Sequence, residues 1–141
     1  MSESQLLDLL ASHHRGVLVT LRPGGRPQLS IVDYSYDAAS RTVRVSTTAD
    51  RAKVRNLRRD PRASFHVSST DGARFVVADG QAELSAIAAD PGDAAVEELI
   101  RLYRDVQGEH PDWADYRAAM VADRRLVLRV HVQHVYGYLG E

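Results

Sequence analysis

Two segments with strand character are joined by a strong turn signal. ASFHVS (63–68) and RFVVADGQAEL (74–84) are rich in residues that favour strands, and Asp71-Gly72 between them is typical of a tight hairpin turn. Strands with so short a connection pair antiparallel, because a parallel partner needs a long crossover. This region therefore predicts an antiparallel sheet, and Asp79-Gly80 inside the second strand predicts a β-bulge.

Further strand signals lie on both sides of this hairpin. GVLVTL and PQLSIVDYSY flank the glycine-rich RPGGR, which predicts a long hairpin over residues 16–36. In TVRVST, Val43, Val45 and Thr47 alternate with polar residues, and RLVLRVHV and HVYGYL predict two final strands. Six or seven strands in antiparallel hairpins predict a small barrel rather than a parallel sheet.

Helical periodicity appears at the start of the chain and in an insertion. Three leucines at helical spacing near the N-terminus predict a short amphipathic helix. The insertion, at about 90–123, has a 3.6-residue period and predicts two helices separated by GEHPD. Asp90 is expected to cap the first of them, with Pro91 at its first helical position. Its apolar stripe consists of Val96, Leu99, Ile100, Tyr103 and Val106.

Length and composition place this pattern in one α+β domain, mainly antiparallel β, over residues 1–141. The sequence contains no cysteine, which excludes disulfides, iron–sulfur clusters and thiolate metal sites. The start, MSESQLLDLL, lacks a basic leading region, and no segment is long and apolar enough to span a membrane. We expect a soluble, cytoplasmic protein that does not enter a membrane.

Basic residues are concentrated in one short segment. Residues 51–62 contain five arginines and the only lysine, Lys53, beside a single acid, although the whole chain has a formal net charge of −1. Asp50 is a candidate N-cap, and Asp60-Pro61 is a candidate stop, so the segment predicts a short helix between two strands. Its buried side is expected to carry Val54 and Leu57.

The position of two cations in this helix is unusual. Arg51 and Lys53 fall in the first turn, where the helix dipole disfavours positive charge by about 0.3–1 kcal/mol. A phosphate or carboxylate held between them would explain the placement, with Thr47 and Thr48 available from the preceding strand. A solvated arginine face is the alternative. No matching basic stripe occurs elsewhere, so we expect no nucleic-acid partner.

One histidine pair has a spacing seen in metal sites. His131 and His134 form H-x-x-H, but an odd separation on a strand sends the two side chains to opposite faces of the sheet. We therefore expect no metal site.

The order of these segments resembles a known family. The hairpin, VRVSTTADRAKVRNLRRDPRASFHV, ADGQAEL, the helical insertion and HVYGYL together resemble the pyridoxamine 5'-phosphate oxidase-like proteins, and most of all their actinobacterial branch that uses the deazaflavin coenzyme F-420. The resemblance covers nearly the whole chain, and its most specific part is R-x-K followed by N-L-x-x-D-P-R. It implies an FMN-binding-like split β-barrel with short helices, assembled as a homodimer.

The resemblance also implies a cofactor site at the dimer interface. Arg51 and Lys53 correspond to ligands of the cofactor phosphate, with Ser46 and Thr47 beside them. Two polar residues of the second strand are expected to face the ring, and two residues at the exit of a turn to approach from the partner chain. These are Gln28 and Ser30, and Arg74 and Phe75 respectively.

Three functional classes fit this resemblance. The first is a coenzyme F-420-dependent oxidoreductase that transfers a hydride between C5 of the cofactor and a planar conjugated acceptor, such as a quinone, a tetrapyrrole or a coumarin-like ring. The second is a split-barrel oxidase or reductase that binds flavin mononucleotide, whose ring system and phosphate the basic helix cannot distinguish from the deazaflavin. The third is a dimer that binds or carries the cofactor without catalysis. The ending HVYGYLGE lacks the R-L-x-P-like substrate motif of pyridoxamine phosphate oxidases.

Overall fold

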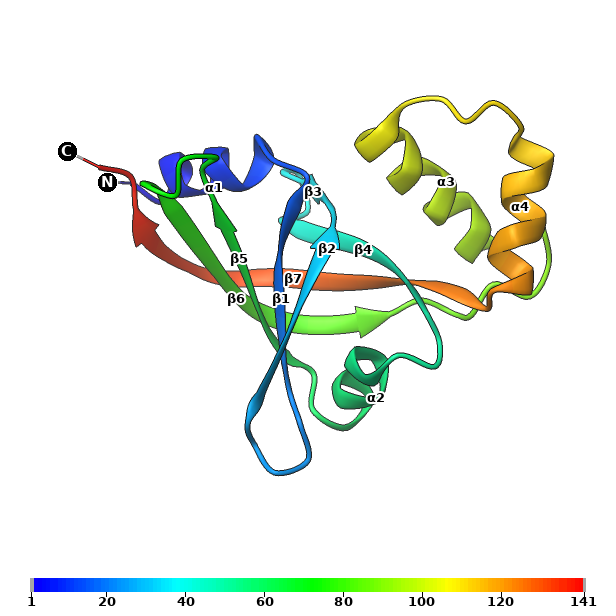
Figure 1. Cartoon of the computed structure of the whole chain (residues 1–141), viewed down its shortest axis with the longest axis horizontal. Coiled ribbons are helices and arrows are strands. Elements are labelled where there is room, and N and C mark those ends of the chain that lie inside the picture. Colours follow the sequence, from blue (N-terminus) through cyan, green and yellow to red (C-terminus); the bar gives the residue numbers. More distant parts are fainter. Residues whose placement is uncertain (1, 141) are drawn as a thin grey trace.

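The computed structural model describes residues 2–140 (Figure 1). Across this range the chain forms seven antiparallel strands in one sheet and four helices. The strands are β1 (Arg15–Leu21), β2 (Pro27–Asp33), β3 (Ser35–Asp37), β4 (Thr42–Thr48), β5 (Arg62–Ser68), β6 (Phe75–Leu84) and β7 (Arg125–Tyr138). The helices are α1 (Glu3–Ala11), α2 (Ala52–Arg59), α3 (Ala94–Gln107) and α4 (Trp113–Ala122). None of the helices in the described range is both long and apolar enough to cross a membrane.

The order of the strands forces the sheet to curl. The order is β2-β1-β5-β6-β7-β4-β3, so β2 and β3 lie at opposite edges. In the sequence, however, only Tyr34 separates the end of β2 from the start of β3. A flat sheet cannot place its two edges one residue apart, and the sheet therefore bends round as a half-barrel (Figure 1). The expected antiparallel split barrel is confirmed.

Tyr34 closes the curled sheet from inside. Its side chain is fully buried, its ring packs edge-on against Phe65 at 4.7 Å between centroids, and its hydroxyl donates a hydrogen bond to the carbonyl of Leu10. Burial raises the pKa of the Tyr34 hydroxyl far above its usual range, so the group stays protonated as a donor. One side chain thus links the strand edges, the core and α1.

The β-bulge expected at Asp79-Gly80 is present. The register of β6 against β7 shifts there, because Asp79 pairs with His134 whereas Gly80 pairs with Val132. Gln133 is left as the extra residue, so β7 continues through this point. The two final strands expected from RLVLRVHV and HVYGYL are therefore one strand of 14 residues, and that expectation was wrong.

The first helix of the insertion begins later than expected. Asp93, not Asp90, is its N-cap: the Asp93 carboxylate accepts hydrogen bonds from the amides of Val96, Ala89 and Asp90. The carboxylate of Asp90 instead accepts from the amide of Gly92 within the preceding turn. Pro91 therefore lies in a turn before α3. Asp93 wins because its carboxylate satisfies amides on both sides of the helix start.

The insertion, α3 and α4, packs at one end of the half-barrel (Figure 1). Its apolar stripe forms a second core with the sheet, made of Ala88, Val96, Leu99, Ile100, Tyr116, Met120 and Val127. The main core lies inside the curled sheet and includes Leu10, Leu18, Val43, Val54, Phe65 and Leu126. The helix α2 connects the end of β4 to the start of β5 and packs against β1 and β6. The candidate site lies between the start of α2 and the insertion.

Candidate functional site

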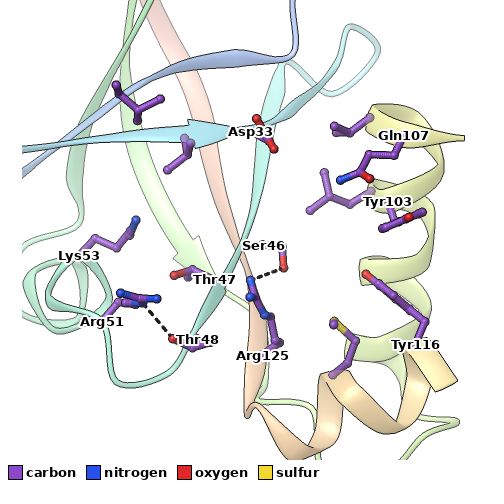
Figure 2. Close-up of a pocket in the computed structure, with 15 residues that line it drawn as sticks. Asp33, Ser46, Thr47, Thr48, Arg51, Lys53, Tyr103, Gln107, Tyr116 and Arg125 are labelled. Atoms are coloured by element: carbon purple, nitrogen blue, oxygen red, sulfur yellow. Dashed lines mark hydrogen bonds between the residues drawn. The ribbon is translucent and has the colours of Figure 1, made fainter. Parts of the chain in front are cut away.

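A cavity of about 510 Å3 lies between the start of α2, the ends of β2 and β4, and the inner face of the insertion (Figure 2). Its polar lining residues are Asp33, Ser46, Thr47, Thr48, Arg51, Lys53, Gln107 and Arg125. Its apolar and aromatic lining residues are Ile31, Val32, Leu102, Tyr103, Val106, Tyr116 and Met120. One wall is thus polar and cationic, and the facing wall is largely apolar.

The turn from β4 into α2 places Arg51 at the N-terminal end of the helix. The amide of Arg51 donates to the carbonyl of Thr48 at 3.2 Å, and this turn makes Arg51 the N-cap. The expectation that Asp50 caps the helix was wrong. Its carboxylate instead accepts a hydrogen bond from the Thr48 hydroxyl at 2.8 Å, which lowers the pKa of Asp50. No side chain within residues 2–140 caps the first turn of α2.

Arg51 is held by a neutral partner. Its Nε donates to the Thr48 hydroxyl at 3.2 Å, and in the described part of the chain it forms no ion pair (Figure 2). An arginine at a helix start next to uncapped amides gathers positive potential in one place. The arrangement favours an anion in the cavity.

Lys53 also lines the cavity, and like Arg51 it has no carboxylate partner among the described residues. Its Nζ is 3.3 Å from the hydroxyl of Ser30, and no carboxylate of residues 2–140 pairs with it. Burial of the side chain, and to a smaller extent the charge of Arg51, lower the pKa of Lys53. Both effects disfavour the charged form of Lys53, and a bound anion would stabilise that form.

The acid content of the cavity does not neutralise these cations. Asp33 is the one carboxylate among the described lining residues, and it forms an ion pair at 3.0 Å with Arg15, its partner in register on β1. Arg51, Lys53 and Arg125 therefore leave the cavity with a net positive character. A ligand that carries anionic groups together with a planar apolar part matches both walls.

Four of the eight residues expected in the site line this cavity. They are Ser46, Thr47, Arg51 and Lys53. Ser30 does not line the cavity, but its hydroxyl accepts a hydrogen bond from Lys53, which does. The predicted residues at the end of β4 and at the start of α2 therefore line the same cavity.

Gln28 lies outside the cavity lining. Its side-chain carbonyl accepts a hydrogen bond of 2.7 Å from the side-chain amide of Asn56, and the same side-chain amide donates to the hydroxyl of Thr20 at 3.0 Å. Asn56 is buried, on the side of α2 that packs against the barrel. Within one chain, Gln28 therefore holds α2 onto the β1–β2 hairpin.

Arg74 and Phe75 stand at the other end of the sheet. Phe75 pairs with Ser68 at the far end of β5, whereas α2 joins β5 at its first residue, Arg62. The ring of Phe75 stacks on His66 with 5.7 Å between centroids. One chain does not bring these residues to the cavity, and their approach from a partner chain remains a prediction.

The wall formed by the insertion was not foreseen from the sequence. The sequence places Tyr103 and Val106 in an apolar stripe, and both line the cavity. Tyr103 also packs against the second core, to which Val96, Leu99 and Ile100 of the stripe belong. The hydroxyl of Tyr116 donates to the carbonyl of Leu99 at 3.0 Å. Burial raises the pKa of Tyr116 to about 12, against an opposing effect of Arg125. This hydroxyl is therefore a structural donor at neutral pH.

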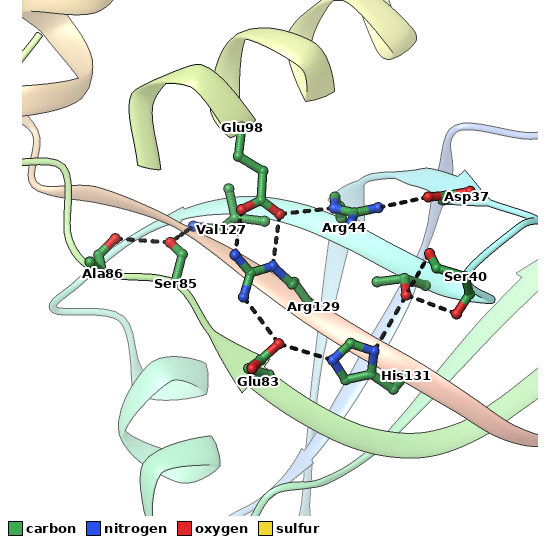
Figure 3. Close-up of polar contacts among 11 residues, drawn as sticks. Asp37, Ser40, Arg44, Glu83, Ser85, Ala86, Glu98, Val127, Arg129 and His131 are labelled. Atoms are coloured by element: carbon green, nitrogen blue, oxygen red, sulfur yellow. Dashed lines mark hydrogen bonds and ion pairs between the residues drawn. The ribbon is translucent and has the colours of Figure 1, made fainter. Parts of the chain in front are cut away.

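A buried carboxylate fixes this wall against the sheet (Figure 3). Arg44 and Arg129 face each other across β4 and β7, a pairing of like charges that is unfavourable alone. Glu98 of α3 lies between them and accepts hydrogen bonds from both, at 2.9 Å and 2.8 Å. Burial raises the pKa of Glu98, but these hydrogen bonds lower it to a net value below the ordinary one. The contact ties α3 to two strands at once.

Residues 2–140 contain no group of three or more potential metal ligands among histidines and acids. His131 instead contacts Glu83, and His134 contacts Asp79.

A curled antiparallel sheet of seven strands, with short helices and a cationic cavity beside α2, gives the described residues a split-barrel fold. Residues 2–138 match the family described as "Pyridoxamine 5'-phosphate oxidase". The chain belongs to this family, and the resemblance seen in the sequence is confirmed.

Individual relatives are similar over most of their length. A biliverdin reductase of Mycobacterium tuberculosis that depends on reduced coenzyme F-420 is 29% identical over 131 residues, which is 93% of this chain and 84% of the relative. A conserved hypothetical protein of the same organism superposes with a TM-score of 0.75 at 26% identity, over 98% of this chain and 84% of that one. A solved F-420 reductase has a TM-score of 0.68 at 25% identity, over 92% and 94% of the two chains.

Proposed function

We propose that the protein is a coenzyme F-420-dependent reductase that transfers a hydride to a planar conjugated small molecule. The observation that carries the proposal is the pair Arg51 and Lys53, which lines one cavity without an acidic partner among the described residues. The reductases that depend on F-420 among the similar proteins support the choice of cofactor.

The residues present fit such a cofactor. Arg51 and Lys53 would bind its phosphate, and the hydroxyls of Ser46 and Thr47 would complete the polar surround. When bound, a 5-deazaflavin supplies hydride chemistry at C5, and the protein contributes position and electrostatics. The apolar wall, which includes Tyr103 and Met120, would exclude water and orient a flat acceptor against the ring.

The proposal includes a homodimer with a shared site. Leu29 and Ile31 of the edge strand β2 are 62% and 74% exposed, which is unusual for large aliphatic side chains on one face of one strand. A second copy that covers this face would bury them. Gln28 and Ser30 on the same strand would then act as ring-side polar groups, and Arg74 and Phe75 would enter from the partner.

A flavin mononucleotide protein is the competing assignment, because the same two cations would bind that phosphate.

Turnover distinguishes a reductase from a carrier. Reduced F-420 is mixed anaerobically with a naphthoquinone, a linear tetrapyrrole or a coumarin, and the return of the oxidised cofactor's absorbance is followed. We expect oxidation that depends on both the acceptor and the protein. Tight binding of F-420 without turnover of any acceptor would instead indicate a carrier.

A further inference from the structure

Arg125 is an arginine of the cavity whose hydrogen-bonding capacity is largely unused. Its Nε is buried and has no partner within residues 2–140, and its remaining contact is a hydrogen bond of 3.3 Å from Nη1 to the hydroxyl of Ser46. A buried donor without a partner costs about 1–3 kcal/mol. The described chain therefore leaves most of the donors of this guanidinium unused.

Three other partly buried arginines each pair with at least one carboxylate. Arg129 donates to Glu98 and Glu83, and Arg44 contacts Glu98 and Asp37. Arg41, whose Nε is also without a partner in the described structure, pairs with Glu3. By contrast, no carboxylate of the described residues pairs with Arg125.

Arg125 is also separate from the basic helix. It is the first residue of β7 and pairs in register with Thr48 of β4. Figure 2 shows its side chain near Ser46, with Arg51 and Lys53 on one side and Tyr103 and Tyr116 on the other. The cavity therefore has two cationic centres on different elements, one beside α2 and one facing the insertion.

We propose that Arg125, positioned by its hydrogen bond to Ser46, forms a carboxylate-binding subsite, distinct from the phosphate site of Arg51 and Lys53. A guanidinium binds a carboxylate through two parallel hydrogen bonds, and the Nη atoms of Arg125, which have no carboxylate partner among the described residues, are the donors that such a pair needs. The neighbouring aromatic wall would hold the conjugated part of the same molecule. Resting on the proposed function, this assigns the acceptor to planar conjugated compounds that carry a carboxylate.

The carboxylate could come from the acceptor or from the glutamate tail of the cofactor, so the test has two arms. In the first arm, biliverdin and its dimethyl ester are titrated into the protein without cofactor. In the second, F-420 is compared with flavin mononucleotide, which has a phosphate but no carboxylate. The variants are Arg125→Gln and Arg125→Lys. Arg124→Gln is the matched control, because Arg124 is the exposed neighbour of Arg125 and this change removes the same charge.

In Arg125→Gln we expect about 10- to 100-fold weaker binding of biliverdin, the range for loss of a charge-assisted contact, and less than about a twofold change for the ester. The affinity of Arg125→Lys for biliverdin should lie between those of the wild type and Arg125→Gln, since lysine keeps the charge but cannot form two parallel hydrogen bonds to a carboxylate. Arg124→Gln should bind both like the wild type. Melting curves show which variants are folded, and Arg125→Lys carries the comparison if Arg125→Gln is not.

Weakened F-420 binding with unchanged flavin mononucleotide and biliverdin binding would support a carboxylate subsite at Arg125 for the cofactor tail, and would overturn the assignment of a carboxylate-bearing acceptor. Equal losses for acid and ester together with equal losses for both cofactors, or no loss at all, would overturn the subsite. The reductase proposal fails separately, when wild-type protein does not oxidise reduced F-420 with any acceptor.

Discussion

The ammonium of Lys53 and the hydroxyl of Ser30 are 3.3 Å apart, which joins the start of α2 to the edge strand β2 at the rim of the cavity. The two residues are 23 positions apart in the sequence. The contact gives the cation a weak neutral partner, and leaves its charge available to a ligand.

Replacing Lys53 by alanine should weaken binding of F-420 by about 10- to 100-fold, because a charge-assisted hydrogen bond to the phosphate is lost. Burial and the charge of Arg51 lower the pKa of Lys53, so the folded protein disfavours this cation. The ligand-free variant should therefore melt at the same temperature as the wild type or slightly higher. Cofactor fluorescence and thermal melts measure the two quantities.

Arg58→Ala is the matched control for this change, because Arg58 is an exposed cation of the same helix outside the cavity. It should leave cofactor affinity nearly unchanged. Equal losses in the two variants would point to a general effect of positive charge on α2, contrary to a phosphate site at Lys53.

Replacing Glu98 by glutamine should lower the free energy of unfolding by about 3 kcal/mol, because it leaves Arg44 and Arg129 facing each other without the buried carboxylate between them. Glu97→Gln on the same helix should cost less than about 1 kcal/mol, since its pair with Arg117 is partly exposed. Urea unfolding at neutral pH measures both. Similar small effects in the two variants would show that Glu98 does not anchor α3.

The contribution of Glu98 should depend on pH. Its folded-state pKa lies below the ordinary value of 4.5, so its stabilising effect is complete above that pH and is lost as the pH falls through the folded-state pKa. The difference in unfolding free energy between the wild type and Glu98→Gln should therefore be constant from pH 7 to about 5 and shrink below 4.5. A difference that grows on acidification has the wrong sign for this account.

Replacing Gly80 by alanine should destabilise the protein by about 1–3 kcal/mol, because an added Cβ would overlap the carbonyl oxygen of His131 at the bulge. Gly24→Ala, in the hairpin turn, meets nothing within 4 Å and should be nearly neutral. Thermal melts compare the two. A neutral Gly80→Ala would mean that β6 and β7 separate at the bulge more easily than their register indicates.

Sedimentation at micromolar concentration should give twice the mass of one chain. Leu29→Glu should shift the protein towards monomer, because it places a charge on the exposed apolar face of β2 without altering a residue that lines the cavity. Ser4→Glu adds the same charge on α1 and should leave the dimer intact. A monomeric wild type that still binds cofactor tightly would contradict both the dimer and a site shared between chains.

Local patterns predicted much of the secondary structure. The alternation in TVRVST, the Asp71-Gly72 turn and the Asp79-Gly80 bulge each depend on residues close together in the chain. Helix starts were harder, because neighbouring aspartates compete: Asp90 and Asp93 can each cap α3, and the choice depends on which amides each one reaches.

Contacts between distant segments could not be read in the same way. The curl of the sheet, which places β2 and β3 at opposite edges and yet one residue apart, depends on pairings across the whole chain. Arg125 looks like an ordinary surface arginine at the start of a strand. Its place in the cavity follows only from its contact with Ser46, 79 residues away.

The central claim is that the cationic cavity binds a deazaflavin phosphate ester in preference to flavin mononucleotide. Its most direct test is a side-by-side equilibrium titration of the purified protein with F-420 and flavin mononucleotide, followed by fluorescence in the same buffer. We predict a dissociation constant for F-420 that is lower by at least a factor of about ten, equivalent to about 1.4 kcal/mol. Tighter binding of flavin mononucleotide would contradict the assignment.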